Sequence, residues 1–166
     1  PEVVDAVAPI PVLAAGGIGN GRQVAAALAL GAQGVWMGSA WLTTEEAETH
    51  PVVKEKFLRA SSSDTIRSRS LTGKPARMLR SGWTEAWEDP SNPRPLPMPL
   101  QPRLVREAQA RIARSAHKNS GAAELSNYFV GQIVGSLKHV KSVRSVMEEL
   151  VQEYADTMER LDDWAK

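Results

Sequence analysis

The chain has 166 residues, of which 42% are apolar, and this suits one domain, or part of one, with a hydrophobic core. A net charge of +1 gives no overall field for nucleic acid, and the absence of cysteine excludes disulfides and Cys-based zinc sites. No apolar run reaches the roughly 18 residues that a membrane span needs, and no signal-peptide pattern opens the chain. We therefore expect a cytoplasmic protein that binds neither nucleic acid nor a membrane.

The first forty residues have the pattern of a βαβ unit. Ile10–Ala15 is a short apolar run ended by a glycine pair, which indicates a buried strand and a tight turn. Asn20 suits the N-cap of the helix that follows, and Gly31 stands where that helix should end. A second apolar run, Gly34–Gly38, comes next. Because the strands are joined through a helix, we expect them to be parallel, with a right-handed crossover.

The middle of the chain is mixed in character. Thr43–Glu46 has the spacing of a capping box, and a second helix is expected over Pro51–Ala60, with the proline in its first turn. Residues 61–88 mix Ser, Arg, Thr and Gly with two tryptophans, and we expect irregular or short elements there. From Pro90 to Pro102 six of thirteen residues are proline, which removes backbone donors and predicts an extended connector.

The last part of the chain is expected to be mainly helical. A helical pattern covers Leu104–Ala116, and a glycine-containing segment, Asn119–Gly135, follows. Ser142 suits the N-cap of a final helix, whose apolar residues recur at spacings of three and four and share one face. That face either packs on its own domain, which is the preferred interpretation, or binds a partner. Its members are Val143, Val146, Met147, Leu150, Val151, Tyr154, Met158, Leu161 and Trp164.

Two consecutive predicted strands each end in a glycine turn, Ala14–Ile18 and Trp36–Ser39. In a parallel βα barrel the phosphate of a cofactor commonly sits in the loops after the last two strands, where backbone N–H groups point at the anion. Glycine is needed there because a Cβ would keep the backbone from the phosphate oxygens and would disfavour positive φ. Ser39 adds a hydroxyl donor. The paired turns predict a phosphate cradle, whereas one glycine pair alone would indicate only a tight turn.

These residues carry a resemblance to a known family. The segment Pro11–Ser39, PVLAAGGIGNGRQVAAALALGAQGVWMGS, closely resembles the seventh- and eighth-strand region of nitronate monooxygenases (2-nitropropane dioxygenases) and the related FMN-dependent enoyl-ACP reductases. The similarity continues more loosely through Thr43–Ala60. It returns at Val130–Gly135, which is similar to the family's C-terminal Gly-Gln-x-x-Gly segment, and it is thin between about 61 and 127.

The resemblance implies an α/β fold, the C-terminal part of a (β/α)8 TIM barrel: its last two strands, an irregular insertion and a long C-terminal helix. Residues 1–60 would form the last βα units, 61–129 the insertion and proline-rich connector, and 130–166 the region of the helix that packs on the barrel. The chain opens without Met and soon enters an apolar run. We expect the N-terminal half of the same barrel as its partner, either as a separate clipped chain or as sequence beyond the one given. A homodimer is also open.

By the same resemblance the cofactor is FMN, with Gly17 against its phosphate. The residues that would bind the cofactor are Gly16, Gly17, Trp36, Met37, Gly38 and Ser39. Many family members have Gln in place of Trp36 and Thr in place of Ser39. Serine keeps the hydroxyl donor, whereas Trp36 would contact the cofactor through its backbone or its ring, or not at all. Gln132 either reaches toward the active site or starts a helix.

No catalytic residue is assigned in this chain. The family's usual general base is a histidine in the earlier half of the barrel, and His50, His117 and His139 match no such motif. His50 precedes a proline and His139 lies in a polar, lysine-containing segment. We therefore expect both of these histidines at the surface.

The resemblance implies a flavoprotein oxidoreductase that oxidises alkyl nitronates, its small-molecule substrates, with molecular oxygen. One alternative of the same fold is an NAD(P)H-dependent FMN enoyl-thioester reductase, in which a basic cluster would meet an anionic carrier. More simply, this cluster is a solvated face that pairs with acids elsewhere. Another alternative is a non-catalytic barrel fragment whose C-terminal helix binds a partner. The basic cluster contains Arg67, Arg69, Lys74 and Arg77.

Overall fold

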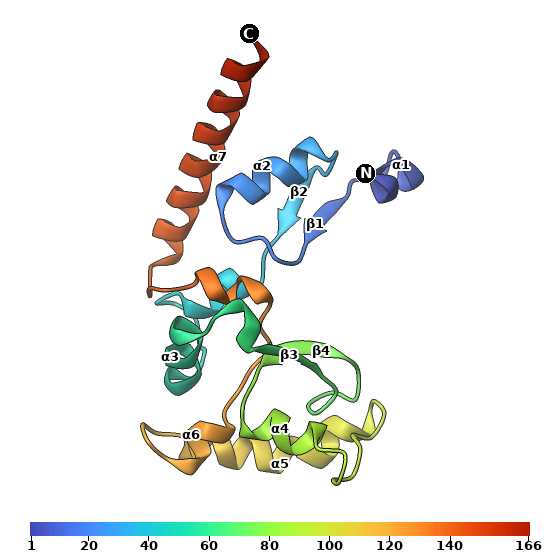
Figure 1. Cartoon of the computed structure of the whole chain (residues 1–166), viewed down its shortest axis with the longest axis vertical. Coiled ribbons are helices and arrows are strands. Elements are labelled where there is room, and N and C mark those ends of the chain that lie inside the picture. Colours follow the sequence, from blue (N-terminus) through green and yellow to red (C-terminus); the bar gives the residue numbers. More distant parts are fainter. The chain divides into compact units, whose positions relative to one another are not determined.

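The computed structural model describes all 166 residues, which divide into two compact units (Figure 1). The first unit comprises residues 1–47 and 139–166, and the second comprises residues 48–138. We describe each unit by itself. None of the helices has both the length and the apolar character that crossing a membrane requires.

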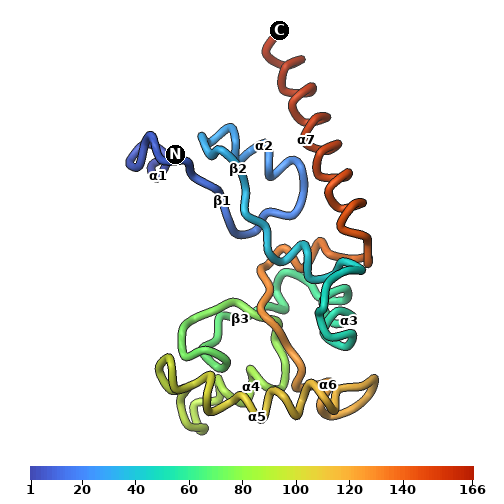
Figure 2. The backbone as a smooth tube through the Cα atoms, turned by 180° about the vertical axis from the view of Figure 1, so that it is seen from behind, coloured from blue at the N-terminus to red at the C-terminus, as the bar shows by residue number.

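The first unit is built around two short parallel strands. Its elements are α1 (Glu2–Val7), β1 (Leu13–Ala15), α2 (Gly21–Ala29), β2 (Gly34–Trp36), the 3-10 helix η1 (Ser39–Thr43) and α7 (Val143–Ala165). Figures 1 and 2 show β1 and β2 side by side, with α2 next to them. In the register, Leu13 pairs with Gly34, and Ala15 pairs with Trp36. The expected βαβ unit with parallel strands is confirmed.

Local hydrogen bonds explain the bounds of these elements. The Asn20 side chain accepts from the backbone N–H of Gln23 at 2.9 Å and caps α2, and Gly31, with φ +99°, ends it. Strand β1 is shorter than the apolar run predicts. Pro11 has no N–H, and the N–H of Val12 donates to the Gln33 side chain at 2.6 Å, so strand pairing begins only at Leu13.

The two faces of the β1–β2 sheet differ in how they are covered. Ala14 and Val35 pair in the register, share one face and line apolar pockets together with side chains of α2. Leu13 and Trp36 belong to the other face, because side chains alternate along a strand. They are 52% and 69% exposed. Within the first unit, one face of the sheet and both outer strand edges therefore have no partner.

Helix α7 packs against the N-terminus of α2. A Cβ on Gly21 would collide with the backbone of α7 at the Leu150 carbonyl and the Tyr154 amide, so glycine permits the close approach. Only two residues of α7, Leu150 and Thr157, are buried. The expectation that the apolar stripe packs on its own domain thus holds for only part of the stripe. Met147, Val151, Met158, Leu161 and Trp164 remain exposed.

The expected capping box at Thr43–Glu46 is wrong. No helix begins there, because Thr43 ends η1 and the N–H of Glu45 donates to the Lys141 carbonyl at 3.0 Å. The Glu46 carboxylate instead accepts from the N–H of Val143 at 2.9 Å, at the start of α7. The residue therefore caps a helix that begins almost a hundred positions later in the sequence.

The second unit combines a β-hairpin with short and medium-length helices and 3-10 turns. Its core contains Phe57, Met78 and Val134, all without exposed surface. Strands β3 and β4 pair antiparallel. The elements are α3 (Pro51–Arg59), η2 (Ser62–Asp64), β3 (Thr65–Ser68), β4 (Ala76–Leu79), α4 (Gly82–Glu88), α5 (Leu100–Ser115), α6 (Gly121–Leu125) and η3 (Gln132–Ser136).

Residues 61–88 form short elements, one of the two expectations for this stretch: the hairpin of β3 and β4, and α4. The buried positions of β3 include the polar residues Thr65 and Ser68. The alternation of apolar and polar residues that predicts a strand is therefore missing. The proline-rich stretch connects α4 to α5, as expected, but α5 begins at Leu100, within the predicted connector. Gln101 holds it in place, accepting from the Leu96 N–H at 2.9 Å and donating to the Ser70 carbonyl at 2.7 Å.

The contact between α2 and α7 can be tested at Gly21. We expect Gly21→Ala to lower the free energy of unfolding by about 1–3 kcal/mol, because the added methyl group collides with the backbone of α7. Gly121 is the matched control, since it also opens a helix but has no atom within 4 Å of the position that a Cβ would take. Gly121→Ala should be neutral or stabilising. Urea unfolding of the intact protein measures both, and equal midpoints would contradict the close packing.

Candidate functional site

The two predicted glycine turns lie at the same end of neighbouring strands. Ala15 pairs with Trp36 in the parallel register, Gly16 follows the first strand, and Met37 and Gly38 follow the second. Parallel strands leave the sheet in the same direction, so both turns occur at the carboxyl edge of the sheet (Figure 1). The structure thus brings the two turns together, as the phosphate cradle requires.

The glycines of the two turns differ in their backbone conformation. Gly16 and Gly17 have φ of +96° and +71°, the left-handed region that other residues enter at a cost. Gly38 has φ of −116°, which any residue can adopt. Around all three, no heavy atom lies within 4 Å of where a Cβ would be. At Gly38 glycine therefore serves neither the backbone conformation nor the packing inside this chain, and it leaves open space beside the strand end.

Both turns also carry backbone N–H groups that have no acceptor in the protein. The N–H groups of Gly17, Ile18 and Gly38 donate to no acceptor within the protein. Successive free amides in a glycine-containing turn form a concave site for anions. Ser39, the first residue of η1, follows directly and carries a hydroxyl group. The arrangement suits a phosphate or another small oxyanion.

Trp36 and Met37 lie differently from each other at this edge. The Trp36 side chain is on the uncovered face of the sheet. The Met37 side chain lines an apolar groove of about 590 Å³ with α2 and α7, and its carbonyl accepts from the Trp41 indole N–H at 2.8 Å. Trp36 also lines this groove, although it is 69% exposed, so both residues border the space between the sheet, α2 and α7.

Sequence reasoning missed Gln23 beside the first turn. Its side chain accepts from the Gly19 N–H at 2.8 Å and donates to the Gly17 carbonyl at 2.7 Å. The signal was present in the sequence, because Asn20 and Gln23 have the N-cap and N3 spacing of a capping box. Here the glutamine reaches past the cap into the glycine turn.

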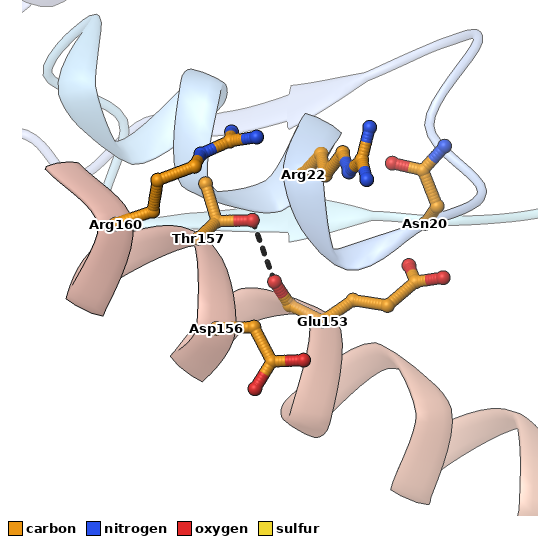
Figure 3. Close-up of a pocket in the computed structure, with 6 residues that line it drawn as sticks. All are labelled: Asn20, Arg22, Glu153, Asp156, Thr157 and Arg160. Carbon is orange, nitrogen blue, oxygen red and sulfur yellow. Dashed lines mark hydrogen bonds between the residues drawn. The ribbon is translucent and has the colours of Figure 1, made fainter.

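A second pocket of the first unit lies between α2 and α7 and has a volume of about 350 Å³. Figure 3 shows that Arg22 comes from α2, whereas Arg160 and the acidic residues Glu153 and Asp156 come from α7. The Glu153 carboxylate accepts from the Gly21 N–H at 2.7 Å, so a carboxylate already occupies the N-terminus of α2. With its charges balanced, this pocket is not a second anion site.

The histidines and Gln132 show no catalytic arrangement. His50 is half-buried, contrary to expectation, because its ring caps α3 by accepting from the Val52 N–H at 3.3 Å. His139 is exposed, as expected, and so is His117. Gln132 is exposed and begins η3. Its expected reach toward an active site stays a prediction.

The pKa shifts all belong to structural contacts of the second unit. Burial lowers the pKa of Lys56, whose ammonium donates to the carbonyls of Glu124 and Ser126. The backbone and hydroxyl of Ser61 lower the pKa of Asp64, and hydrogen bonds from Ser91 lower the pKa of Asp89. These groups hold helix ends and turns in place, so their shifts do not identify a proton-transfer group.

The basic cluster contributes to a separate pocket of about 340 Å³ in the second unit. Arg67 and Arg69 line it together with the acidic Glu88. Arg77 donates to the Thr65 hydroxyl at 2.9 Å. No ion pair joins these residues to an acid, so neither of the two interpretations of the basic cluster is decided.

A parallel βαβ unit with free amides in both strand-end turns is typical of α/β proteins that bind a phosphate group. Comparison with known proteins then gives the family. The sequence profile of the nitronate monooxygenase family matches residues 1–153, and the chain therefore belongs to this family.

Two curated relatives illustrate the match. The chain is 65% identical to a candidate monooxygenase of Mycobacterium tuberculosis, over 97% of this chain and 43% of the relative. It is 38% identical to a candidate nitronate monooxygenase of Bacillus subtilis, over 92% of this chain and 42% of the relative. The chain thus spans about two fifths of the length of these relatives.

Solved structures agree with this family. A nitroalkane oxidase from Streptomyces ansochromogenes superposes with a TM-score of 0.81 at 29% identity, over 96% of this chain and 43% of the other. FabK from Thermotoga maritima superposes with a TM-score of 0.77 at 34% identity, over 98% of this chain and 50% of the other. The backbone arrangement described above is thus found in enzymes of known structure.

The different conformations of the glycines predict different costs of substitution. Gly17→Ala forces a side chain into the left-handed region and should lower the free energy of unfolding by about 1–2 kcal/mol. Gly38→Ala requires no strained backbone and no displaced atom, so it should leave stability within about 0.5 kcal/mol. Chemical denaturation of the two variants without added ligand measures this difference. A larger loss for Gly38→Ala would show that its surroundings are not open.

Proposed function

We propose that this chain is the phosphate-binding part of an FMN-dependent oxidoreductase, the C-terminal portion of a (β/α)8 barrel that oxidises alkyl nitronates with molecular oxygen. One observation carries the proposal: the free amides of Gly17, Ile18 and Gly38 lie in two turns at the same edge of a parallel sheet. Membership of the nitronate monooxygenase family supports the choice of cofactor and substrate class.

The residues of both turns suit a flavin phosphate. The amides of Gly17, Ile18 and Gly38 would donate to its oxygens from the two turns, and the Ser39 hydroxyl would add a further donor. Gly16 allows the first turn to form, and Met37 contributes through its backbone. Donation by neutral amides to a charged acceptor is stronger than donation between neutral groups, so a few such bonds suffice to hold the cofactor.

Trp36 would meet the flavin through its ring. Its side chain lies on the uncovered sheet face and is 69% exposed in this chain. An indole ring offers apolar surface and one N–H, and it cannot reproduce the two-sided hydrogen bonding of the glutamine found in many family members. We propose that Trp36 packs beside the cofactor and limits the space available to substrates.

The remaining strands of the barrel would complete the site. Leu13 and Trp36 expose apolar surface on the interior side, and the outer edges of β1 and β2 are unpaired. An eight-stranded closed barrel covers such a face and removes both edges. The curated relatives have more than half of their length outside the matched region, and we place the missing strands and the general base there.

The proposed chemistry depends on the cofactor. When bound, a flavin supplies two-electron chemistry, by which electrons leave an organic substrate and reach molecular oxygen. The residues of this chain would bind and orient the cofactor and exclude water from part of its surface. None of their side chains is proposed as the proton donor or acceptor of the reaction. A cytoplasmic location and a homodimer stay predictions.

A second candidate of the same fold is an NAD(P)H-dependent FMN enoyl-thioester reductase. The similarity to FabK, with a TM-score of 0.77, gives this candidate partial support. The family match favours the nitronate reaction. Nitronate-dependent oxygen uptake, compared with nicotinamide-dependent reduction of the flavin, separates the two reactions in one preparation.

The cofactor proposal is tested at Gly38. Gly38→Val fills the open space next to the strand end without straining the backbone, so flavin should be lost while the fold persists. We expect the dissociation constant for FMN to rise about tenfold or more, which corresponds to a loss of roughly 1.4 kcal/mol of binding free energy, and the absorbance near 450 nm of the purified protein to fall as a result. Circular dichroism checks the fold.

Gly121→Val is the control, because its surroundings are equally open but lie in the second unit. It should keep the flavin. If the unaltered protein binds no flavin, or if Gly38→Val keeps a full complement, the two turns are structural and the third candidate, a non-catalytic barrel fragment with a partner-binding helix, gains support.

A further inference from the structure

We propose that Gln23 is a positioning residue that sets the direction of the Ile18 N–H, a phosphate-binding amide of the first glycine turn. The proposal rests on the proposed function and deepens it, since it names the group that makes the turn selective for a phosphorylated flavin. Gln23 lies in the first turn of α2 and is half-buried. It is not among the residues that the family resemblance assigned to the cofactor.

The side chain of Gln23 binds two peptide groups at once. Its carbonyl oxygen Oε1 accepts from the Gly19 N–H at 2.8 Å, and its amide Nε2 donates to the Gly17 carbonyl at 2.7 Å. Both distances are short for such bonds. One side chain therefore fixes the peptide group that follows Gly17 and the peptide group that precedes Gly19.

Because the peptide group is planar, the contact with the Gly17 carbonyl also fixes the direction of the Ile18 N–H. In a trans peptide the C=O and the next N–H point in opposite directions. Because the Gly17 carbonyl is held toward Gln23, the N–H of Ile18 must point away from α2, where it meets no protein acceptor. The Ile18 N–H, a free donor beside the proposed phosphate, is thus oriented by the Gln23 side chain, which binds the other end of the same peptide group.

The turn needs such support because of its composition. Gly16, Gly17 and Gly19 lack a Cβ, so their peptide groups can rotate between alternative orientations at low cost. An unsupported turn would spend part of its time with a carbonyl directed at the anion. If the orientation is fixed before binding, no free energy is spent on ordering the turn when the phosphate binds, and the affinity is higher.

Gln23 is itself held firmly. The Asn20 side chain accepts from its backbone N–H at 2.9 Å, and the Glu153 carboxylate accepts from the N–H of Gly21 at 2.7 Å. Gly21 in turn packs on the backbone of α7. The support of the glycine turn therefore extends from α7 through the first turn of α2 to Gln23.

The test compares FMN with riboflavin, which has the same ring system but no phosphate. Gln23→Met keeps the length of the side chain and removes both hydrogen bonds. In the intact protein freed of flavin, we expect its dissociation constant for FMN to rise roughly tenfold or more. The constant for riboflavin should stay within about twofold, because riboflavin makes no use of the phosphate-binding amides.

Gln33 provides a matched control. Its side chain also accepts from one backbone N–H, that of Val12 at 2.6 Å, and donates to one carbonyl, that of Gly31 at 2.7 Å. It does so at the amino ends of the strands, away from the glycine turns. Gln33→Met should leave the ratio of the FMN and riboflavin constants unchanged.

A second variant keeps the test valid if Gln23→Met does not fold. Gln23→Glu retains the acceptor for the Gly19 N–H and loses the donor for the Gly17 carbonyl. Its FMN affinity should fall even in about 1 M salt, where repulsion between the new charge and the phosphate is largely screened. A loss that disappears in salt would overturn the proposal.

The remaining outcomes also decide the matter. If the Gln23 substitutions weaken FMN and riboflavin binding by the same factor, Gln23 has only a structural role. If the variants bind FMN as tightly as the unaltered protein does, Gln23 has no role in cofactor binding. Either result leaves the proposed function standing when the unaltered protein still prefers FMN. If the unaltered protein binds FMN and riboflavin equally, no phosphate is held at the turns, and both the positioning role and the proposed cradle fail together.

Discussion

The parallel pairing of β1 with β2 is the constraint on which the site depends. Three residue pairs set the register, and the last, Ala15 with Trp36, places both glycine turns immediately beyond the same sheet edge. An antiparallel pair, or a shift of a few residues, would separate the free amides of Gly17 and Gly38. The helix between the strands makes the parallel arrangement possible, because such a crossover returns the chain to the same starting edge.

The first unit then stabilises these turns from one side only. Asn20 and Gln23 fix the entrance to α2, and α7 closes on Gly21. The opposite face of the sheet, with Leu13 and Trp36, stays uncovered. This asymmetry is what a segment of a closed barrel should show: a finished outer layer of helices and an interior face that needs further strands. It also explains why the cradle can be described from this chain alone, whereas the substrate pocket cannot.

Sequence reasoning succeeded where local signals act alone and failed where distant residues take part. The caps at Asn20 and Ser142 are local, and the helices they begin were predicted correctly. Glu46 was misassigned because its partner, Val143, belongs to another part of the chain. The β3–β4 hairpin was missed because Thr65 and Ser68 are polar and buried. The glycine turns were predicted from spacing, but the support from Gln23 became visible only in three dimensions.

The central claim is that the two turns bind one anion, the phosphate of a flavin mononucleotide. A crystal structure of the intact protein grown with FMN measures this most directly. We expect phosphate oxygens within hydrogen-bonding distance of the amides of both Gly17 and Gly38, close to the Ser39 hydroxyl. A phosphate bound elsewhere, or contacted by only one of the two turns, would contradict the claim.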